Sequence, residues 1–249
     1  MPRSGGRRVD ELRPVVLEPN FMPYAEGSCL VQTGGTRVVC TATIEEGIPD
    51  WLRATELGWL EAEYCMLPRS SPQRIQREVN TGRPRPRTIE IQRLIGRSLR
   101  AAVNLGGLGK RTIVIDCDVL QADGGTRTAS ITGSFVALAR ALEHLERQGG
   151  IDASPLLHSV AAVSVGIVDG EPRLDLDHAE DRGASVDMNV VMTGEGDFVE
   201  IQATAEHGSF DHSATEALLD LARKGILELL EQQRAALSHP AHKPTSESG

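Results

Sequence analysis

A glycine pair, two hydroxyl side chains and an arginine follow one another where a strand is expected to turn into a helix. The segment spans residues 120–130 (LQADGGTRTAS), with Gly124, Gly125, Thr126 and Arg127 at its centre. Glycine lets a backbone approach a ligand closely, the first amides of a helix can bind an anion, and a guanidinium group suits phosphate. The segment predicts an oxyanion site. Taken alone, it also allows an ordinary glycine turn with Arg127 on the surface.

Carboxylates gather around a second turn, in residues 174–191. Asp187 begins an otherwise apolar strand, where an unpaired carboxylate is costly, so a cation or a basic partner is expected beside it. Asp181 lies six residues earlier and reaches the same cation if the loop folds back. Magnesium commonly takes one or two protein carboxylates and completes its shell with water and phosphate. Spacing alone leaves a solvent-facing acidic hairpin equally open.

A third group is basic and lies in the first half of the chain. Residues 69–100 hold nine arginines and two acidic residues, a local charge of +7 within a chain of net charge -9. The arginines are Arg69, Arg74, Arg77, Arg83, Arg85, Arg87, Arg93, Arg97 and Arg100. A basic segment on an acidic body predicts one docking place for a polyanion, although a solvated loop without a ligand remains the alternative.

Several classes of protein are disfavoured by what the sequence lacks. No apolar run is long enough to span a bilayer, and no apolar stretch follows the charged start as in a signal peptide, so we expect a soluble protein of the cytoplasm. Four cysteines lie singly in strand-like segments, which predicts buried thiols rather than zinc or disulfides. Neither a GxxxxGK[ST] loop nor an HExxH helix is present.

The elements that must position these groups follow from hydrophobic periodicity and turn residues. Strands are predicted at 14–17, 28–33, 36–44, 59–66, 111–120, 159–168, 173–176, 185–193 and 198–205, and helical patterns at 88–103, 131–147 and 213–237. Residues 68–86 contain four prolines and predict a long loop that carries the basic group. We expect one α/β (α+β) domain over residues 1–237, with a mixed sheet packed against helices, and a disordered tail at 238–249.

Together, an oxyanion turn, a carboxylate pair and a basic loop supply the parts for metal-assisted phosphoryl or nucleotidyl transfer on a polyanionic chain. Five ordered blocks, covering most of the chain, also resemble the bacterial RNase PH family of phosphorolytic exoribonucleases. The blocks are residues 27–28 with 38–42, then 61–69, 90–100, 116–129 and 187–193. The resemblance extends over about residues 8–230.

This resemblance implies that inorganic phosphate attacks the last phosphodiester at the 3′ end of tRNA precursors and releases a nucleoside 5′-diphosphate. It also implies that the enzyme acts in the turnover of rRNA and structured RNA. It assigns phosphate binding to Arg87, Gly125, Thr126 and Arg127, magnesium binding and catalysis to Asp181 and Asp187, and tRNA contacts to Arg69, Arg74 and Arg77. It also implies the RNase PH-type β-α-β-α fold and a homo-hexamer built as a trimer of dimers.

Three positions depart from the family pattern: His178, Ala203 and His207. None coincides with a phosphate or acidic position. The alternative function is a non-catalytic RNA-binding ring subunit of an exosome-like assembly. Such subunits typically lose the phosphate arginine or the acidic pair, whereas this chain retains both. A polynucleotide phosphorylase would need a second catalytic core and RNA-binding modules, for which this chain is too short.

Overall fold

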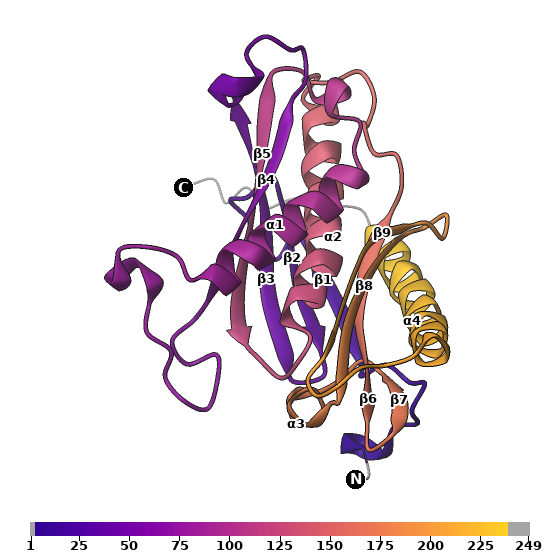
Figure 1. Cartoon of the computed structure of the whole chain (residues 1–249). Helices are drawn as coiled ribbons and strands as arrows, with labels where there is room; N and C mark the ends of the chain where they lie inside the picture. Colours follow the sequence, from indigo (N-terminus) through magenta and orange to yellow (C-terminus); the bar gives the residue numbers. More distant parts are fainter. Residues whose placement is uncertain (1–2, 239–249) are drawn as a thin grey trace, which may run out of the picture.

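Two β-sheets and four α-helices make up the computed structural model, which describes residues 3–238 (Figure 1). The sheets have five and four strands, in the orders β1-β2-β3-β5-β4 and β7-β6-β8-β9. Helices α1 and α2 pack on the first sheet, and α2 also contacts the second. The predicted mixed α/β architecture is thus confirmed, and the single-domain reading stays a prediction.

The five-stranded sheet combines antiparallel hairpins with one parallel pair. Its strands are β1 (Val15–Pro19), β2 (Gly27–Thr33), β3 (Thr36–Glu46), β4 (Trp59–Met66) and β5 (Arg111–Gln121). A turn at Gly34-Gly35 joins β2 to β3. Strand β4 runs parallel to β5, and a parallel pair needs a crossover, which α1 (Pro86–Ala101) provides. The arginine segment therefore lies on the connection between these two strands.

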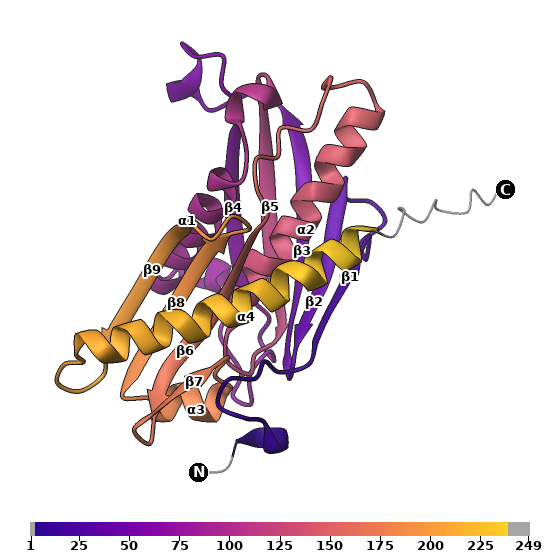
Figure 2. The same cartoon turned by 90° about the vertical axis from the view of Figure 1, so that its right-hand side faces the viewer.

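The second sheet is an antiparallel array with two short turns and one longer connection, from β7 to β8, that contains α3. It contains β6 (Val160–Val168), β7 (Glu171–Leu174), β8 (Val186–Thr193) and β9 (Phe198–Ala205). Turns at Asp169-Gly170 and around Gly196 join β6 to β7 and β8 to β9. Both faces of this sheet are covered: along β6, Val160 and Ala162 join the core shared with α2, whereas the alternate residues Val163 and Val165 pack toward α4 (His212–Ser238). Figure 2 shows α4 lying across that outer face.

The central helix α2 (Thr126–Arg147) is buried along nearly its whole length because it lies between the two sheets. It begins directly after the glycine pair, before the apolar pattern starts at Ile131. A short helix, α3 (His178–Gly183), occupies part of the acidic turn that the sequence analysis treats as a loop. Its start is fixed by a capping box: Asp177 accepts from the amide of Glu180, whose side chain reaches back to the amide of Asp177.

The expectation of four buried thiols holds for three of the cysteines. Cys29, Cys40 and Cys117 are buried as predicted, but Cys65 is exposed, because its side chain lies on the opposite face of β4 from the core residues Leu60 and Tyr64. The predicted disordered tail falls almost wholly outside the described residues. None of the helices between residues 3 and 238 combines the length and apolar character needed to cross a bilayer.

Candidate active site

The turn between β5 and α2 has a backbone that only glycine readily adopts. Gly124 and Gly125 have φ values of 76° and 65°, in the left-handed region. A Cβ on Gly124 would lie 2.5 Å from the carbonyl oxygen of Leu176, so the turn also packs too closely for a side chain. No side chain caps the start of α2 at Gly125. The first amides of the helix are therefore available to an anion, and the macrodipole favours one there.

Two side chains of the turn are held by partners from other elements. The hydroxyl oxygens of Thr126 and Tyr64, on β4, are 2.8 Å apart. Arg127 places Nη1 at 3.5 Å from a carboxylate oxygen of Glu90 on α1 and donates a 3.3 Å hydrogen bond to Gln202 on β9. The turn thus lies where α1, β4 and β9 meet. Glu90 and Gln202 hold the side chain of Arg127 in place, but the 3.5 Å ion pair is too long to neutralise its positive charge fully.

Arg87 comes to this turn from the first turn of α1. Pro86 starts the helix, and Glu78 in the preceding loop accepts a 2.6 Å hydrogen bond from the hydroxyl of Thr88. Burial raises the pKa of Tyr64, while its hydrogen bond with Thr126 and the charges of Arg87 and Arg127 act to lower it. Both arginines therefore act on the charge state of the Tyr64 hydroxyl, which itself contacts Thr126 of the turn.

The carboxylate pair lies in the same electrostatic environment. Asp187 is partly buried near the start of β8, between Gly166 of β6 and Thr204 of β9, and Asp181 lies on α3. Burial raises the pKa of Asp187, and the charge of Asp181 raises it further, against the opposing charges of Arg127 and Arg87. The solvent-facing hairpin is thus not the arrangement of Asp187, which faces two like charges, those of Asp181 and Glu206, together with the charges of Arg127 and Arg87.

These two carboxylates suit a magnesium ion that takes its remaining ligands from water and phosphate. Within residues 3–238 no group of three or more His, Cys, Asp or Glu side chains is arranged to hold a metal by protein ligands alone. A divalent cation would relieve the repulsion between Asp181 and Asp187. The turn at residues 124–127, which we call the anion turn, would hold the phosphate that binds the same cation.

The three predicted tRNA-binding arginines lie apart from this cluster. Arg69, Arg74 and Arg77 are exposed in the connection between β4 and α1. Figure 1 shows that connection extending away from the two sheets, and it contains only a short 3-10 helix, Glu78–Thr81. The loop ends at α1, whose first turn carries Arg87. A long anion held by the loop would therefore lead toward the turn.

Sequence reasoning missed the residues that hold the turn from behind. The Thr36 hydroxyl donates to the carbonyl of Gly124 at 2.6 Å and accepts from the amide of Asp123 at 2.9 Å. Arg13 is paired with Asp175 and donates to the carbonyl of Asp123. These contacts join residues 87 or more positions apart, so no local pattern could have identified them. Among these supporting residues, Asp175 has an uncommon backbone conformation, with a positive φ of 54°.

The sequence matches the 3′ exoribonuclease family, domain 1 over residues 11–142 and domain 2 over residues 158–225. A relative named Ribonuclease PH, from Moorella thermoacetica, is 56% identical over 243 residues, which cover 98% of this chain and 97% of the relative. An Archaeoglobus fulgidus exosome structure with RNA bound to the active site has a TM-score of 0.80 and 25% identity over 92% of each chain. Rice Rrp46 shares the fold, with a TM-score of 0.77 and 20% identity over 95% of this chain and 100% of its own.

The first family match alone covers more than half of the sequence, and the bacterial relative is similar over almost its whole length. The chain therefore belongs to the 3′ exoribonuclease family.

Proposed function

We propose that this member of the 3′ exoribonuclease family trims the 3′ extensions of tRNA precursors by phosphorolysis and releases nucleoside 5′-diphosphates. The observation that carries the proposal is the convergence of an uncapped helix start, Arg87 and Arg127 with the carboxylate of Asp187. A site that holds a free phosphate beside a carboxylate pair suits attack by phosphate on a phosphodiester. The similarity to Ribonuclease PH supports the same reaction.

In this proposal, Gly125 and Thr126 offer amides to the attacking phosphate while Arg87 and Arg127 offset its charge. Two anions must meet for the reaction, so their repulsion has to be lowered before in-line attack. Asp181 and Asp187 hold a magnesium ion, which supplies positive charge to the phosphate oxygens when bound. The residues need not provide a strong general base, because hydrogen phosphate is itself a nucleophile.

The reaction balances without another reactant. An oxygen of hydrogen phosphate forms a bond to the phosphorus of the last nucleotide, and the bond from that phosphorus to the 3′ oxygen of the preceding nucleotide breaks. The leaving 3′ oxygen keeps the electron pair and takes up the proton that the phosphate loses. The products are an RNA shorter by one nucleotide, with a free 3′ hydroxyl, and a nucleoside 5′-diphosphate.

RNA enters, in this proposal, along the loop that carries Arg69, Arg74 and Arg77, since the rest of the chain is acidic and repels a polyanion. Turnover of rRNA and other structured RNA uses the same path. We propose a cytoplasmic location, where bacterial tRNA precursors are processed, and a homo-hexamer arranged as a trimer of dimers. Light scattering behind gel filtration tests the assembly, for which six times the 26.8 kDa chain mass is expected.

A phosphate-dependence assay tests the activity. The protein is incubated with magnesium and a tRNA that carries a short 3′ extension, with and without inorganic phosphate, and products are separated by chromatography. We expect nucleoside diphosphates only with phosphate. Equal shortening without phosphate contradicts phosphorolysis, and RNA binding without any diphosphate release supports the non-catalytic ring subunit instead.

Two variants test the assigned residues in the same assay. Asp187→Asn is expected to abolish turnover, and Arg87→Ala to raise mainly the phosphate concentration required. Asp50→Asn is the matched control, because Asp50 is an exposed aspartate that forms an ion pair with the exposed Arg53. Full activity of Asp187→Asn would remove that carboxylate from the mechanism.

A further inference from the structure

A chain segment before the first strand carries three buried arginines to the back of the active site. We call residues 3–13 the N-terminal strap. The side chains of Arg3, Arg7 and Arg13 are 3%, 7% and 4% exposed, a burial that arginine reaches only when it is paired. Their partners are Asp175, Asp177 and Glu180, at the end of β7 and the start of α3. Figure 2 shows the strap lying beside β7 and α3.

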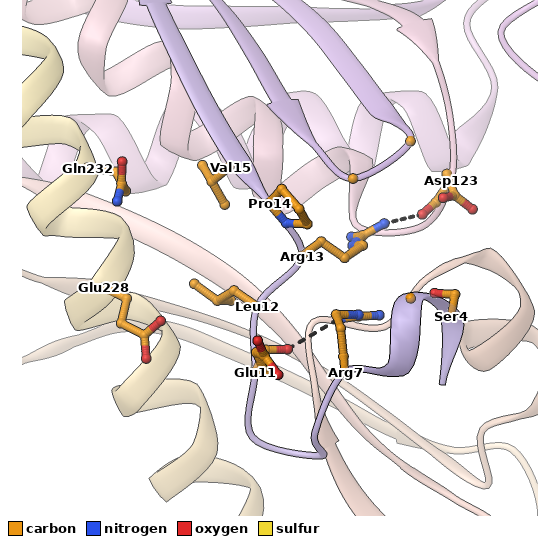
Figure 3. Close-up of a pocket in the computed structure, with 13 residues that line it drawn as sticks. Ser4, Arg7, Glu11, Leu12, Arg13, Pro14, Val15, Asp123, Glu228 and Gln232 are labelled. Carbon is orange, nitrogen blue, oxygen red and sulfur yellow. Dashed lines mark hydrogen bonds between the residues drawn. The ribbon is translucent and has the colours of Figure 1, made fainter. Parts of the chain in front are cut away.

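Arg13 is the strap arginine whose side chain reaches the backbone of the glycine turn. Its Nε and Nη2 donate to the two carboxylate oxygens of Asp175 at 2.9 and 2.6 Å, and its backbone amide donates to the same carboxylate at 2.8 Å. The remaining nitrogen, Nη1, donates to the carbonyl of Asp123 (Figure 3), and Nη2 lies 3.4 Å from the carbonyl of Gly124. One guanidinium therefore joins Asp175 to the two residues that precede Gly125.

The Asp175 side of this bridge is fixed in turn. Its amide donates to the carbonyl of Ser164 on β6 at 2.7 Å, and its backbone is in the left-handed region. Gly124 packs directly against the following residues, Leu176 and Asp177. The Asp123 carboxylate accepts from the amide of His178, the first residue of α3, at 3.4 Å. The turn that starts α2 and the helix that carries Asp181 therefore share one support.

We propose that Arg13 is a positioning residue that holds the Gly124-Gly125 turn, and with it the phosphate-binding amides, in register with α3. Arg13 touches neither the proposed phosphate nor the RNA; it acts through backbone carbonyls on the far side of the turn. The inference rests on the proposed function, because its readout is the use of phosphate. The planar guanidinium group donates to the Asp175 carboxylate and to the carbonyls of Asp123 and Gly124 at the same time. Lysine has a single ammonium group and cannot reproduce this arrangement.

A cavity beside the strap makes this role testable by chemical rescue. It has a volume of about 580 Å³ and is lined by Arg7, Arg13 and Asp123 together with Glu228 and Gln232 of α4. Figure 3 shows Arg13 and Asp123 among the residues around this space, joined by a hydrogen bond. In Arg13→Ala, free guanidinium can enter from the cavity and occupy the place of the lost side chain next to Asp175.

The first measurement compares the KM for inorganic phosphate with kcat in wild type and Arg13→Lys. We expect the KM for phosphate to rise about tenfold, as for a displacement of the binding groups by a fraction of an ångström, with a smaller change in kcat. Titration calorimetry with phosphate alone should show the same loss of affinity. Arg8→Lys is the matched control: Arg8 belongs to the strap, but its side chain is 74% exposed and pairs with Asp10.

The second measurement adds guanidinium chloride to Arg13→Ala at concentrations far below those that unfold proteins, with sodium chloride as the ionic-strength control. We expect the KM for phosphate to move back toward the wild-type value, whereas Arg8→Ala should not respond. If Arg13→Ala fails to fold, Arg13→Lys and Asp175→Asn carry the test, with folding checked by circular dichroism. A folded Arg13→Lys with wild-type affinity for phosphate overturns the inference, as does an equal response of Arg8→Ala to guanidinium.

The failures of the two proposals are distinguishable. If wild type releases no nucleoside diphosphate in the presence of phosphate, the proposed function fails. If wild type releases it and Arg13→Lys has an unchanged KM for phosphate, only the positioning role of Arg13 fails.

Discussion

Asp187 illustrates how a single residue in this protein is placed at a cost to the fold. Its carboxyl is partly buried and faces the like charge of Asp181, and both effects raise its pKa; Arg127 and Arg87 offset them only in part. The folded protein therefore holds the proton of Asp187 more tightly than the unfolded chain does. A carboxylate pair of this kind suits a site that gains a cation during function.

Phosphorolysis is expected to rise with pH as Asp187 loses its proton, with a midpoint above the ordinary range for aspartate, because the ionised form binds the cation. Saturating magnesium should move this midpoint to lower pH, since the ion competes with the proton. The check is the rate measured against pH at low and high magnesium. A midpoint that does not respond to magnesium would contradict a shared carboxylate site.

Activity is expected to rise with pH, whereas the contribution of Asp187 to the free energy of unfolding is expected to fall with pH. Because its pKa is raised in the folded state, its favourable contribution is present at low pH and is lost as pH rises through that pKa. Asp187→Asn should therefore unfold at a higher temperature than wild type near pH 8 while being inactive. Calorimetry of both proteins, with Asp50→Asn as control, tests this; a lower Tm for Asp187→Asn would indicate that the carboxylate is a net stabiliser.

Tyr64→Phe removes the hydroxyl that lies 2.8 Å from the Thr126 hydroxyl. A neutral hydrogen bond contributes on the order of 1 kcal/mol, so the KM for phosphate should rise about fivefold as Thr126 becomes less well fixed. Tyr24→Phe is the control in the same assay, because Tyr24 is 97% exposed. An unchanged KM for Tyr64→Phe would show that Thr126 is held without this contact.

At the scale of elements, the proposed function would make the loop between β4 and α1 separate capture of the RNA from its chemistry. The predicted tRNA-binding arginines are exposed along it, and its end is joined to α1 through Glu78, which accepts from the Thr88 hydroxyl. The turn and α1 are connected by the pair of Arg127 with Glu90. The loop is also joined to the turn through Ser70, whose carbonyl accepts a 2.7 Å hydrogen bond from the amide of Ala122.

Replacing Arg69, Arg74 and Arg77 with alanine should weaken the use of extended tRNA while leaving that of a short oligonucleotide nearly unchanged. The apparent affinity for tRNA should also depend less on salt, since fewer counterions are released. The check is the KM for both substrates at several salt concentrations. A triple variant of Arg53, Arg223 and Arg234 removes the same charge from other exposed positions. Equal losses in both triple variants would contradict a specific role for the loop.

At the scale of the whole molecule, helix α2 packs against both sheets, and the candidate active site lies at the start of this helix. The core that surrounds α2 includes residues of both sheets, such as Val31 from β2 and Val191 from β8. Close approach of strand and helix requires glycine: a Cβ on Gly27 would overlap the carbonyl oxygen of Ala137. The position of the anion turn is therefore tied to how tightly β2 packs on α2.

Gly27→Ala is expected to destabilise the protein by about 3 kcal/mol or more, because an overpacked contact with rigid backbone can be relieved only by moving the sheet or the helix. Urea unfolding of both proteins measures the change. Gly183→Ala serves as the control, since a Cβ there meets no atom within 4 Å and the glycine has no positive φ. A wild-type midpoint for Gly27→Ala would mean that β2 and α2 are not in such close contact.

The sequence by itself determined the elements and the chemical groups. Alternation of apolar and polar residues located strands such as 59–66 and 198–205, because a strand buries every second side chain. Helices leave a local signal in the same way, through apolar residues that recur at helical spacing. The Gly124–Arg127 turn, the two aspartates and the basic loop were also visible, and five ordered sequence blocks carried the family resemblance. Short α3 was missed, since its capping box at Asp177 competes with the signals of an acidic turn.

Only the tertiary structure decided which groups meet. Arg13 lies 162 residues from Asp175, and Tyr64 lies 62 residues from Thr126, so neither partner leaves a trace in the local sequence pattern. Desolvation acts in the same way: the raised pKa of Asp187 depends on the surrounding sheet and on Asp181, Arg127 and Arg87 from three other elements. Burial and electrostatic fields depend on distance in space, which the order of residues does not contain.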